Sequence, residues 1–206
     1  MATITNQAAL SYNGVTTLSN IAVGELVEVL TATKTAADTT YTAGGVKTFV
    51  ISLVNSSAAA LTGLTVTDTL GSYTFSGNTL YPLTYVTGSL LYYVNGALQA
   101  TPTVTATAPL TVTGVTVPAG GSAMLIYTAR VNEYAPLGVE DSITNTATIT
   151  GGGLTSSVTA TETINASPAP QLAISKSISP TMVAENGTLT YTLTLQNLSL
   201  IHISEP

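Results

Sequence analysis

Three residues with complementary chemistry, Lys34, Asp68 and Asn145, occupy positions that strand alternation directs toward a protein interior. Their in-phase apolar neighbours are Leu30 and Ala32 for Lys34, Leu64 and Val66 for Asp68, and Ile143, Ala147 and Ile149 for Asn145. Burial lowers the pKa of a lysine and frees its amine as a nucleophile. With Asp68 shuttling the proton, this amine would attack the Asn145 amide and release ammonia. The pattern predicts an intramolecular isopeptide crosslink.

Two alternatives to this crosslink stay open at the level of sequence. Asn55 is in phase with Phe49, Ile51 and Leu53 and is therefore a rival partner for Lys34. Alternatively, Lys34 ends its strand and extends its amine to water, while Asp68 and Asn145 cap turns. Buried charges commonly pair without reacting, so burial alone does not decide between these interpretations.

Other catalytic chemistry has few residues to support it. A nucleophilic triad needs an imidazole, and the single histidine, His202, lies in the C-terminal tail at 199–206. The closest carboxylate pairs are Glu25 with Glu28 and Glu140 with Asp141, near expected strand ends. Solvated turn charges explain these pairs better than glycoside hydrolysis does. We therefore expect no enzymatic activity.

Composition excludes several other classes of site and partner. Only 7% of the 206 residues are charged, the net charge is −6, and threonine supplies much of the polarity. No basic stripe could neutralise nucleic-acid phosphates, no cysteine can form disulfides or thiolate metal sites, and no apolar run approaches the ~18 residues of a membrane span. Asp38, Asp68 and Asp141 are isolated in sequence, unlike a calcium loop. We expect no metal and no cofactor.

Strand signals dominate the chain, with period-2 alternation bounded by glycine, proline, asparagine and serine. The expected strands are Val27–Thr35, Thr48–Asn55, Leu64–Leu70, Ser89–Val94, Leu110–Val117, Ala123–Val131, Ser142–Thr150, Thr155–Ile164 and Thr190–Gln196. Asn95-Gly96 predicts a two-residue hairpin turn. About seven to nine short strands indicate an all-β fold, an antiparallel immunoglobulin-like β-sandwich.

Internal repetition divides the chain into one whole unit and two partial ones. Lys34-Thr35 and the strand Thr48–Asn55 recur as Lys176-Ser177 and Thr190–Asn197, and Ile4-Thr5-Asn6 recurs as Ile143-Thr144-Asn145. We expect a closing hairpin at 1–26, a complete sandwich at 27–164, a proline-rich linker at 165–170, and the start of another unit at 171–198.

Residues 199–206 depart from the repeat. After Asn197 the repeat predicts a turn and another strand, but the chain reads Leu200-Ile201-His202-Ile203-Ser204. This tail resembles translated sequencing-adapter readthrough, so we expect it to be non-native and the natural protein to be longer.

Six ordered motifs of the central unit resemble a prokaryotic surface repeat catalogued as domain of unknown function eleven. The motifs are Lys34-Thr35, Gly44-Gly45, Ile51–Asn55, Leu64–Leu70, Val117–Gly121 and Ile143–Ile149. The resemblance implies an immunoglobulin-like sandwich strung in tandem on bacterial or archaeal surface proteins. It implies no catalytic activity, and crosslinks of the kind predicted above occur in other such domains of Gram-positive bacteria.

We therefore expect an extracellular or cell-surface structural module, a spacer or filament subunit, although Met1–Asn6 lacks the features of a signal peptide. The alternative is an adhesive or carbohydrate-binding module using the tyrosines Tyr73, Tyr81, Tyr85, Tyr92 and Tyr93. These tyrosines equally suit the wet face of a sheet.

Expected partners are other copies of the chain or other surface proteins. The orphan hairpin at 1–26 could join chains by β-strand donation, or it could pair with an edge of its own central unit.

Overall fold

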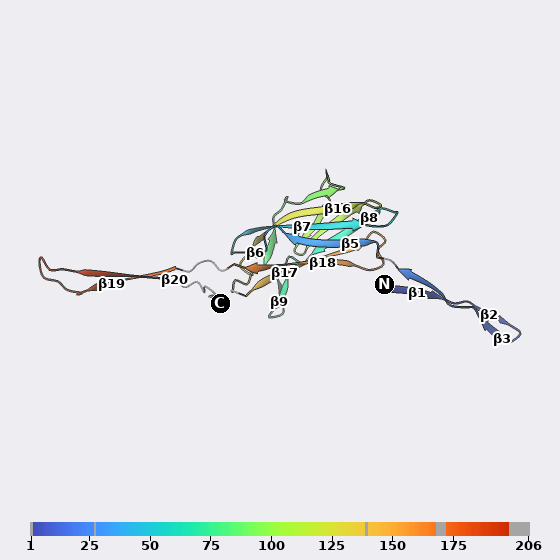
Figure 1. The fold of residues 1–206 in the computed structure, drawn as a ribbon, viewed down its shortest axis with the longest axis horizontal. Coiled ribbons are helices and arrows are strands. Elements are labelled where there is room, and N and C mark those ends of the chain that lie inside the picture. The colour runs from blue at the N-terminus through green and yellow to red at the C-terminus, as the bar shows by residue number, and fades with distance from the viewer. Residues whose placement is uncertain (1, 27, 139, 168–171, 198–206) are drawn as a thin grey trace, which may run out of the picture.

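The computed structural model describes residues 2–26, 28–138, 140–167 and 172–197, and every regular element in these ranges is a β-strand. Two six-stranded sheets form a sandwich at the centre, and two-stranded ribbons lie outside it (Figure 1). The expected all-β, immunoglobulin-like architecture is confirmed.

The first sheet has the order β13-β12-β16-β7-β5, with β11 also paired to β16, and all its pairs are antiparallel. Its strands are β5 (Leu30–Ala36), β7 (Val46–Asn55), β11 (Leu83–Tyr85), β12 (Leu91–Val94), β13 (Ala97–Gln99) and β16 (Ser122–Val131). Strand β7 buries every second residue from Lys47 to Asn55, as expected for a sheet with one face on the core.

The second sheet has the order β14-β15-β8-β17-β18-β6. Its strands are β6 (Thr40–Tyr41), β8 (Leu61–Asp68), β14 (Thr103–Thr107), β15 (Leu110–Val117), β17 (Ser142–Gly151) and β18 (Val158–Ala166). Only the β6–β18 pair is parallel; it joins Asn165 to Thr40 and Ala166 to Tyr41. A small hairpin of β9 (Tyr73–Phe75) and β10 (Asn78–Leu80) follows β8.

The core lies between the two sheets and is filled by the inward residues of both. Phe49, Leu53 and Tyr127 from the first sheet and Leu64 and Ile149 from the second are at most 1% exposed. Each such aliphatic or aromatic side chain contributes about 1.5 to 3 kcal/mol through burial. The sandwich is thus held mainly by apolar packing across the sheets.

Alternation placed the long strands correctly, and the Asn95-Gly96 turn is confirmed: β12 and β13 pair across it, with positive φ angles of 48° and 80°. Some boundaries were wrong. The first strand of the unit begins at Leu30, and β18 begins at Val158 because turns and bends precede it. Asn165 and Ala166, expected in the linker, belong to β18; residues 168–170 lie outside the described ranges.

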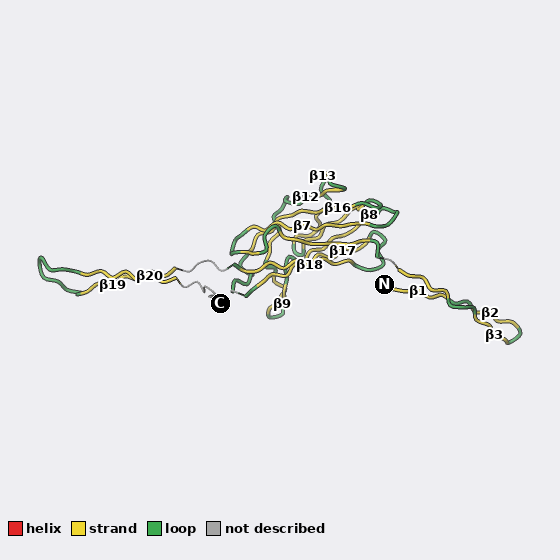
Figure 2. The backbone as a smooth tube through the Cα atoms, viewed as in Figure 1, coloured by secondary structure: helices red, strands yellow, loops and turns green. Residues whose placement is uncertain are grey.

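The N-terminal and C-terminal ribbons are seen best in Figure 2, where they lie apart from the sandwich. At the N-terminus β1 (Ala2–Asn6) pairs with β4 (Ala22–Leu26), and β2 (Ala9–Tyr12) pairs with β3 (Val15–Leu18). At the C-terminus β19 (Leu172–Ser179) pairs with β20 (Thr190–Asn197). Leu10 is 73% exposed and Leu195 is 72% exposed, so both ribbons display apolar side chains to water.

Candidate functional site

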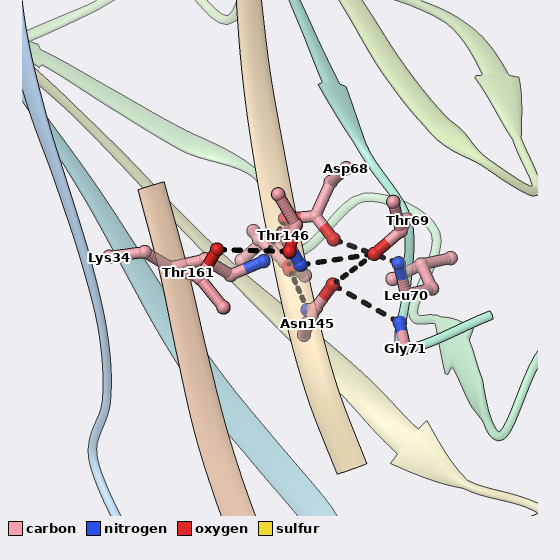
Figure 3. Close-up of polar contacts among 9 residues, drawn as sticks. Lys34, Asp68, Thr69, Leu70, Gly71, Asn145, Thr146 and Thr161 are labelled. Carbon is pink, nitrogen blue, oxygen red and sulfur yellow. Dashed lines mark hydrogen bonds and ion pairs between the residues drawn. The ribbon is translucent and has the colours of Figure 1, made fainter. Parts of the chain in front are cut away.

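The predicted trio meets between the sheets. Lys34 lies within β5 in the first sheet, while Asp68 ends β8 and Asn145 lies on β17 in the second. Their exposed fractions are 4%, 1% and 0%. Figure 3 shows the three side chains converging from separate strands. All three side chains point into the protein interior, as strand alternation predicted.

Lys34 and Asp68 form a buried ion pair between Nζ and Oδ2. Two aromatic rings complete the surroundings of the amine, with Nζ 5.2 Å from the ring centroid of Phe49 and 5.9 Å from that of Tyr127. The two rings stack with centroids 5.5 Å apart. The amine therefore sits on aromatic faces, away from water, with one carboxylate as its charged partner.

Tyr127 of β16 connects the ion pair to the amide. Its hydroxyl donates to Asp68 Oδ2 at 2.7 Å and accepts a hydrogen bond from Asn145 Nδ2 at 3.0 Å. Sequence reasoning missed Tyr127, because in phase with Leu125 and Ala129 it is indistinguishable from an ordinary core aromatic. The available signal was the hydroxyl itself, since a buried tyrosine needs a hydrogen-bonding partner.

The carbonyl oxygen of Asn145 is held separately from its nitrogen. Oδ1 accepts hydrogen bonds from Thr69 Oγ1 and from the Gly71 amide, each at 3.2 Å. Asp68 Oδ1 accepts from the Leu70 amide at 3.0 Å. Among the described residues, no buried side-chain nitrogen or oxygen is left without a hydrogen-bonding partner, so the site is fully ordered by its own contacts.

Burial changes the acidity of two groups in the site. It lowers the pKa of Lys34 below the usual 10.5, although the charge and hydrogen bond of Asp68 act in the opposite direction. Burial, followed by the charge of Asp68, raises the pKa of Tyr127 well above 10.0. Burial thus makes the Lys34 amine easier to deprotonate and keeps the Tyr127 phenol protonated; a neutral amine is the form that attacks an amide, and a phenol can donate a proton.

The rival partner Asn55 is not brought to Lys34. It pairs with Leu30, at the start of β5, across the first sheet. Its Nδ2 donates to the carbonyl oxygens of Ala59 at 2.8 Å and Pro118 at 2.9 Å. Its Oδ1 accepts from the amide and the hydroxyl of Ser57. Asn55 organises the loops at the end of the sandwich.

The five tyrosines considered for binding do not form one exposed surface. Tyr85 and Tyr92 are core residues, each 6% exposed, and the Tyr92 hydroxyl donates to Thr116 O at 2.5 Å. Tyr81 and Tyr93 are half-buried, while Tyr73 is 39% exposed. A groove of about 410 Å³ beside Tyr73 is lined by Gly71, Ser72, Pro82, Pro136, Ser142, Ile143 and Thr144. Only one of the five tyrosines reaches it.

Among the remaining carboxylates considered for catalysis or metal binding, Glu28 and Glu140 are exposed, and Asp141 and Asp38 make local contacts. Asp141 Oδ2 accepts from the Gly138 amide at 2.5 Å, and Asp38 lies 3.5 Å from Lys47 Nζ. No cluster of three or more histidine, aspartate or glutamate side chains suited to a metal occurs in the described ranges. His202 lies outside them. In the same ranges no helix is long and apolar enough to span a membrane.

Comparison with known proteins finds similarity at the level of the fold. No family model matches the sequence, and no curated protein matches it. Among solved structures, the chain is similar to BcpA, the major pilin subunit of Bacillus cereus, with a TM-score of 0.50, 15% identity, and coverage of 94% of this chain and 61% of that one.

Two further structural matches have lower scores. The N-terminal domain of the Streptococcus gordonii adhesin Sgo0707 gives a TM-score of 0.49 at 14% identity, covering 74% of this chain and 35% of that one. The pilus backbone RrgB of Streptococcus pneumoniae gives 0.46 at 14% identity, covering 59% and 31%. The chain therefore spans between about a third and three fifths of these proteins, and what it shares with BcpA is the fold.

Proposed function

We propose that this chain is a structural module of a prokaryotic cell-surface protein, a spacer or filament subunit, whose sandwich is closed by an isopeptide bond between Lys34 and Asn145. One observation carries the proposal: Lys34, Asp68 and Asn145 are buried in a single hydrogen-bonded cluster that bridges the two sheets. A covalent bond there joins β5 to β17.

The reaction uses groups of one hydrogen-bonded cluster, in which Asp68 and Tyr127 link Lys34 to Asn145. Lys34 transfers its extra proton to Asp68 Oδ2, and the neutral amine attacks Cγ of Asn145. Asp68 returns a proton through the Tyr127 hydroxyl to Nδ2 and takes one from the attacking nitrogen. The Cγ–Nδ2 bond then breaks, and ammonia leaves carrying the proton held by Asp68. One amide replaces another, so no oxidant or cofactor is required.

The surface role rests on independent support. The BcpA structure with the same fold is a major pilin subunit, and the six ordered motifs resemble a tandem surface repeat. A threonine-rich chain with only 7% charged residues is typical of extracellular walls and filaments. The void lined by Asp68 and Tyr127 inside the site admits only about 10 Å³, less than a substrate needs.

We further propose a tandem organisation, with a complete unit at 27–164 and the start of another at 171–198. The β19–β20 ribbon supports this, because it pairs Lys176 with Leu193 just as β5–β7 pairs Lys34 with Ile51. Register as well as sequence is therefore repeated. The β1–β4 ribbon pairs Asn6 with Ala22, one residue short of the pairing that Asn145 makes with Glu162.

Intact-mass measurement of the folded chain tests the crosslink. The expected mass is lower than that of the sequence by one ammonia, and peptide mapping places the link between Lys34 and Asn145. Lys34→Met and Asn145→Ala should each restore the full mass, whereas Asn55→Ala should leave the loss unchanged. A full mass in well-folded wild-type protein would show that the ion pair does not react.

For assembly, we propose β-strand donation between copies, with the N-terminal ribbon of one copy docking on the C-terminal ribbon of another. The two ribbons repeat strand pairs, β17–β18 and β5–β7, that pack across the core of the sandwich. Both ribbons expose apolar side chains, including Leu10 and Leu195, whose burial is favourable. We expect the full chain to self-associate and deletion of residues 1–26 to abolish this; light scattering and electron microscopy measure both. Assemblies that persist after the deletion contradict donation.

A further inference from the structure

The turn that follows β8 has an unusual backbone. The Ser72 amide donates to the Thr69 carbonyl at 3.0 Å, which defines a four-residue turn. Both central residues have positive φ, 51° at Leu70 and 71° at Gly71, as in a type I′ turn. Leucine disfavours this conformation, yet Leu70 is fully buried and held in it. Backbone conformations of this kind persist where the surrounding structure maintains them, and they cluster at functional sites.

The consequence of the turn is the direction of two donors. Positive φ at Leu70 and Gly71 turns the Gly71 amide toward Asn145 Oδ1, 3.2 Å away (Figure 3). The Thr69 hydroxyl oxygen accepts from the Thr146 amide at 3.0 Å, so its proton remains for Asn145 Oδ1, also at 3.2 Å. Two donors therefore converge on the carbonyl oxygen of a fully buried side chain.

We propose that Thr69 and the Gly71 amide form an oxyanion hole for the crosslinking reaction; this inference rests on the proposed function. When Lys34 Nζ bonds to Cγ of Asn145, the carbonyl electron pair moves onto Oδ1. The two donors stabilise that negative charge until the carbonyl re-forms and the Cγ–Nδ2 bond breaks. Preorganised donors act most strongly on charge that develops in a buried site. The turn thus holds the Asn145 oxygen with two donors, while the Tyr127 hydroxyl accepts a hydrogen bond from the Asn145 nitrogen.

Asn55 provides an internal comparison. Its Oδ1 also accepts two hydrogen bonds, from the Ser57 amide at 3.0 Å and the Ser57 hydroxyl at 2.7 Å. Across the first sheet Asn55 lies opposite Leu30, at the other end of β5 from Lys34. Its two donors therefore cap a loop and do not face a lysine amine. Ser57→Ala consequently serves as a matched control, because it removes the same kind of hydroxyl donor from an unreactive asparagine.

Gly71 itself is unsuitable for substitution, because a Cβ at this position would lie 2.3 Å from Ile143 Cγ2. Thr69 is the position to vary. Thr69→Val keeps the branched shape and removes the hydroxyl, Thr69→Ser keeps the hydroxyl, and Thr69→Cys substitutes a weak donor. These three changes separate the chemistry of the hydroxyl from its packing.

The experiment follows the loss of ammonia by intact mass during cell-free synthesis of the full chain, sampled from minutes to a day. Thr69→Val should react about 100-fold more slowly than wild type, while Thr69→Ser and Ser57→Ala should react at nearly the wild-type rate. If the valine variant fails to fold, Thr69→Cys still tests the proposal. Its thiol is a weak donor, so its crosslinking rate should be about tenfold below wild type, between the rates of the serine and valine variants.

The outcomes separate the two proposals. Wild-type protein that never loses ammonia refutes the crosslink, and the oxyanion hole with it. If wild-type protein loses ammonia and the folded valine or cysteine variant does so at the same rate, the oxyanion hole alone is refuted. A second readout is the infrared band of the isotope-labelled Asn145 amide in a Lys34→Met background, where the amide stays unreacted. Thr69→Val should shift that band to higher frequency, and an unshifted band contradicts the hydrogen bond on which the proposal depends.

Discussion

The β5–β7 hairpin of the sandwich and the β19–β20 ribbon are two copies of one motif in different surroundings. Both place a lysine over an aromatic ring: Lys34 Nζ lies 5.2 Å from the Phe49 centroid, and Lys176 Nζ lies 4.4 Å from the Tyr191 centroid. Lys34 is buried beneath the second sheet, whereas Lys176 is exposed. The motif thus determines strand register and the lysine–aromatic contact. The opposite sheet supplies the burial, Asp68 and Asn145 on which the proposed crosslink depends.

The largest expected effect is a loss of stability when the buried Lys34–Asp68 ion pair is broken, compared with the more exposed Lys47–Asp38 pair. Asp68→Ala leaves the Lys34 amine buried without its carboxylate, so the free energy of unfolding should fall by about 3 to 5 kcal/mol, and the crosslink should not form. Asp38→Ala is the control, because Asp38 is 72% exposed on the side chain and lies 3.5 Å from Lys47; its loss should cost less than about 1 kcal/mol. Chemical denaturation measures both. Equal losses would mean that burial adds nothing to the pair.

The second largest effect is expected on the crosslinking rate when Tyr127 is changed. Tyr127 lies on β16, which pairs with β7. Tyr127→Phe keeps the ring that stacks on Phe49 and removes the hydroxyl between Asp68 and Asn145. We expect crosslinking to slow about 100-fold, which is the lower end of the range for losing a general acid or base. The far-ultraviolet circular dichroism should stay unchanged. Time-resolved intact mass measures the rate. A wild-type rate in this variant excludes Tyr127 from the proton path.

A smaller effect appears in the pH dependence of stability. Burial, followed by the charge of Asp141, raises the pKa of Tyr41 to about 12 from 10.0, and its hydroxyl donates to Pro136 O at 2.5 Å. A raised folded-state pKa gives stability that is complete below pH 10.0 and is lost as pH rises through about 12. Tyr41→Phe should flatten this decline. Urea denaturation at pH 9 through 12 tests it, and parallel slopes for both proteins would contradict the assignment.

The smallest effect is expected at the second lysine. Lys176→Ala removes an exposed side chain and one cation–aromatic contact, which is worth about 0.5 to 1 kcal/mol at exposed sites. The sandwich should keep its denaturation midpoint and its crosslink. A lost crosslink in this variant would make Lys176 part of the reactive site and would overturn the contrast between the two hairpins.

Alternation predicted the burial of Lys34, Asp68 and Asn145 because a strand with one face on the core alternates regardless of residue type. It could not identify Tyr127, whose position is typical of any core aromatic, or distinguish Asn145 from Asn55, which is equally buried. That distinction depends on which strands face each other across the sandwich. The Thr69–Ser72 turn was equally out of reach, because leucine is not a residue that predicts positive φ. Strand β14 was missed because Thr103–Thr107 is mostly threonine and exposed.

The position of the site along the chain has a mechanical consequence. In the proposed tandem array, tension would enter the unit at the start of β5 and leave at the end of β18, beyond Ala166. A covalent bridge from Lys34 to Asn145 carries that tension directly from β5 to β17. The whole segment from Thr35 to Thr144 would then form a closed loop that bears no load. Roughly 370 Å of extensible chain, at about 3.4 Å per residue, would thereby be withdrawn from stretching, and only the strand residues outside the loop would extend under load.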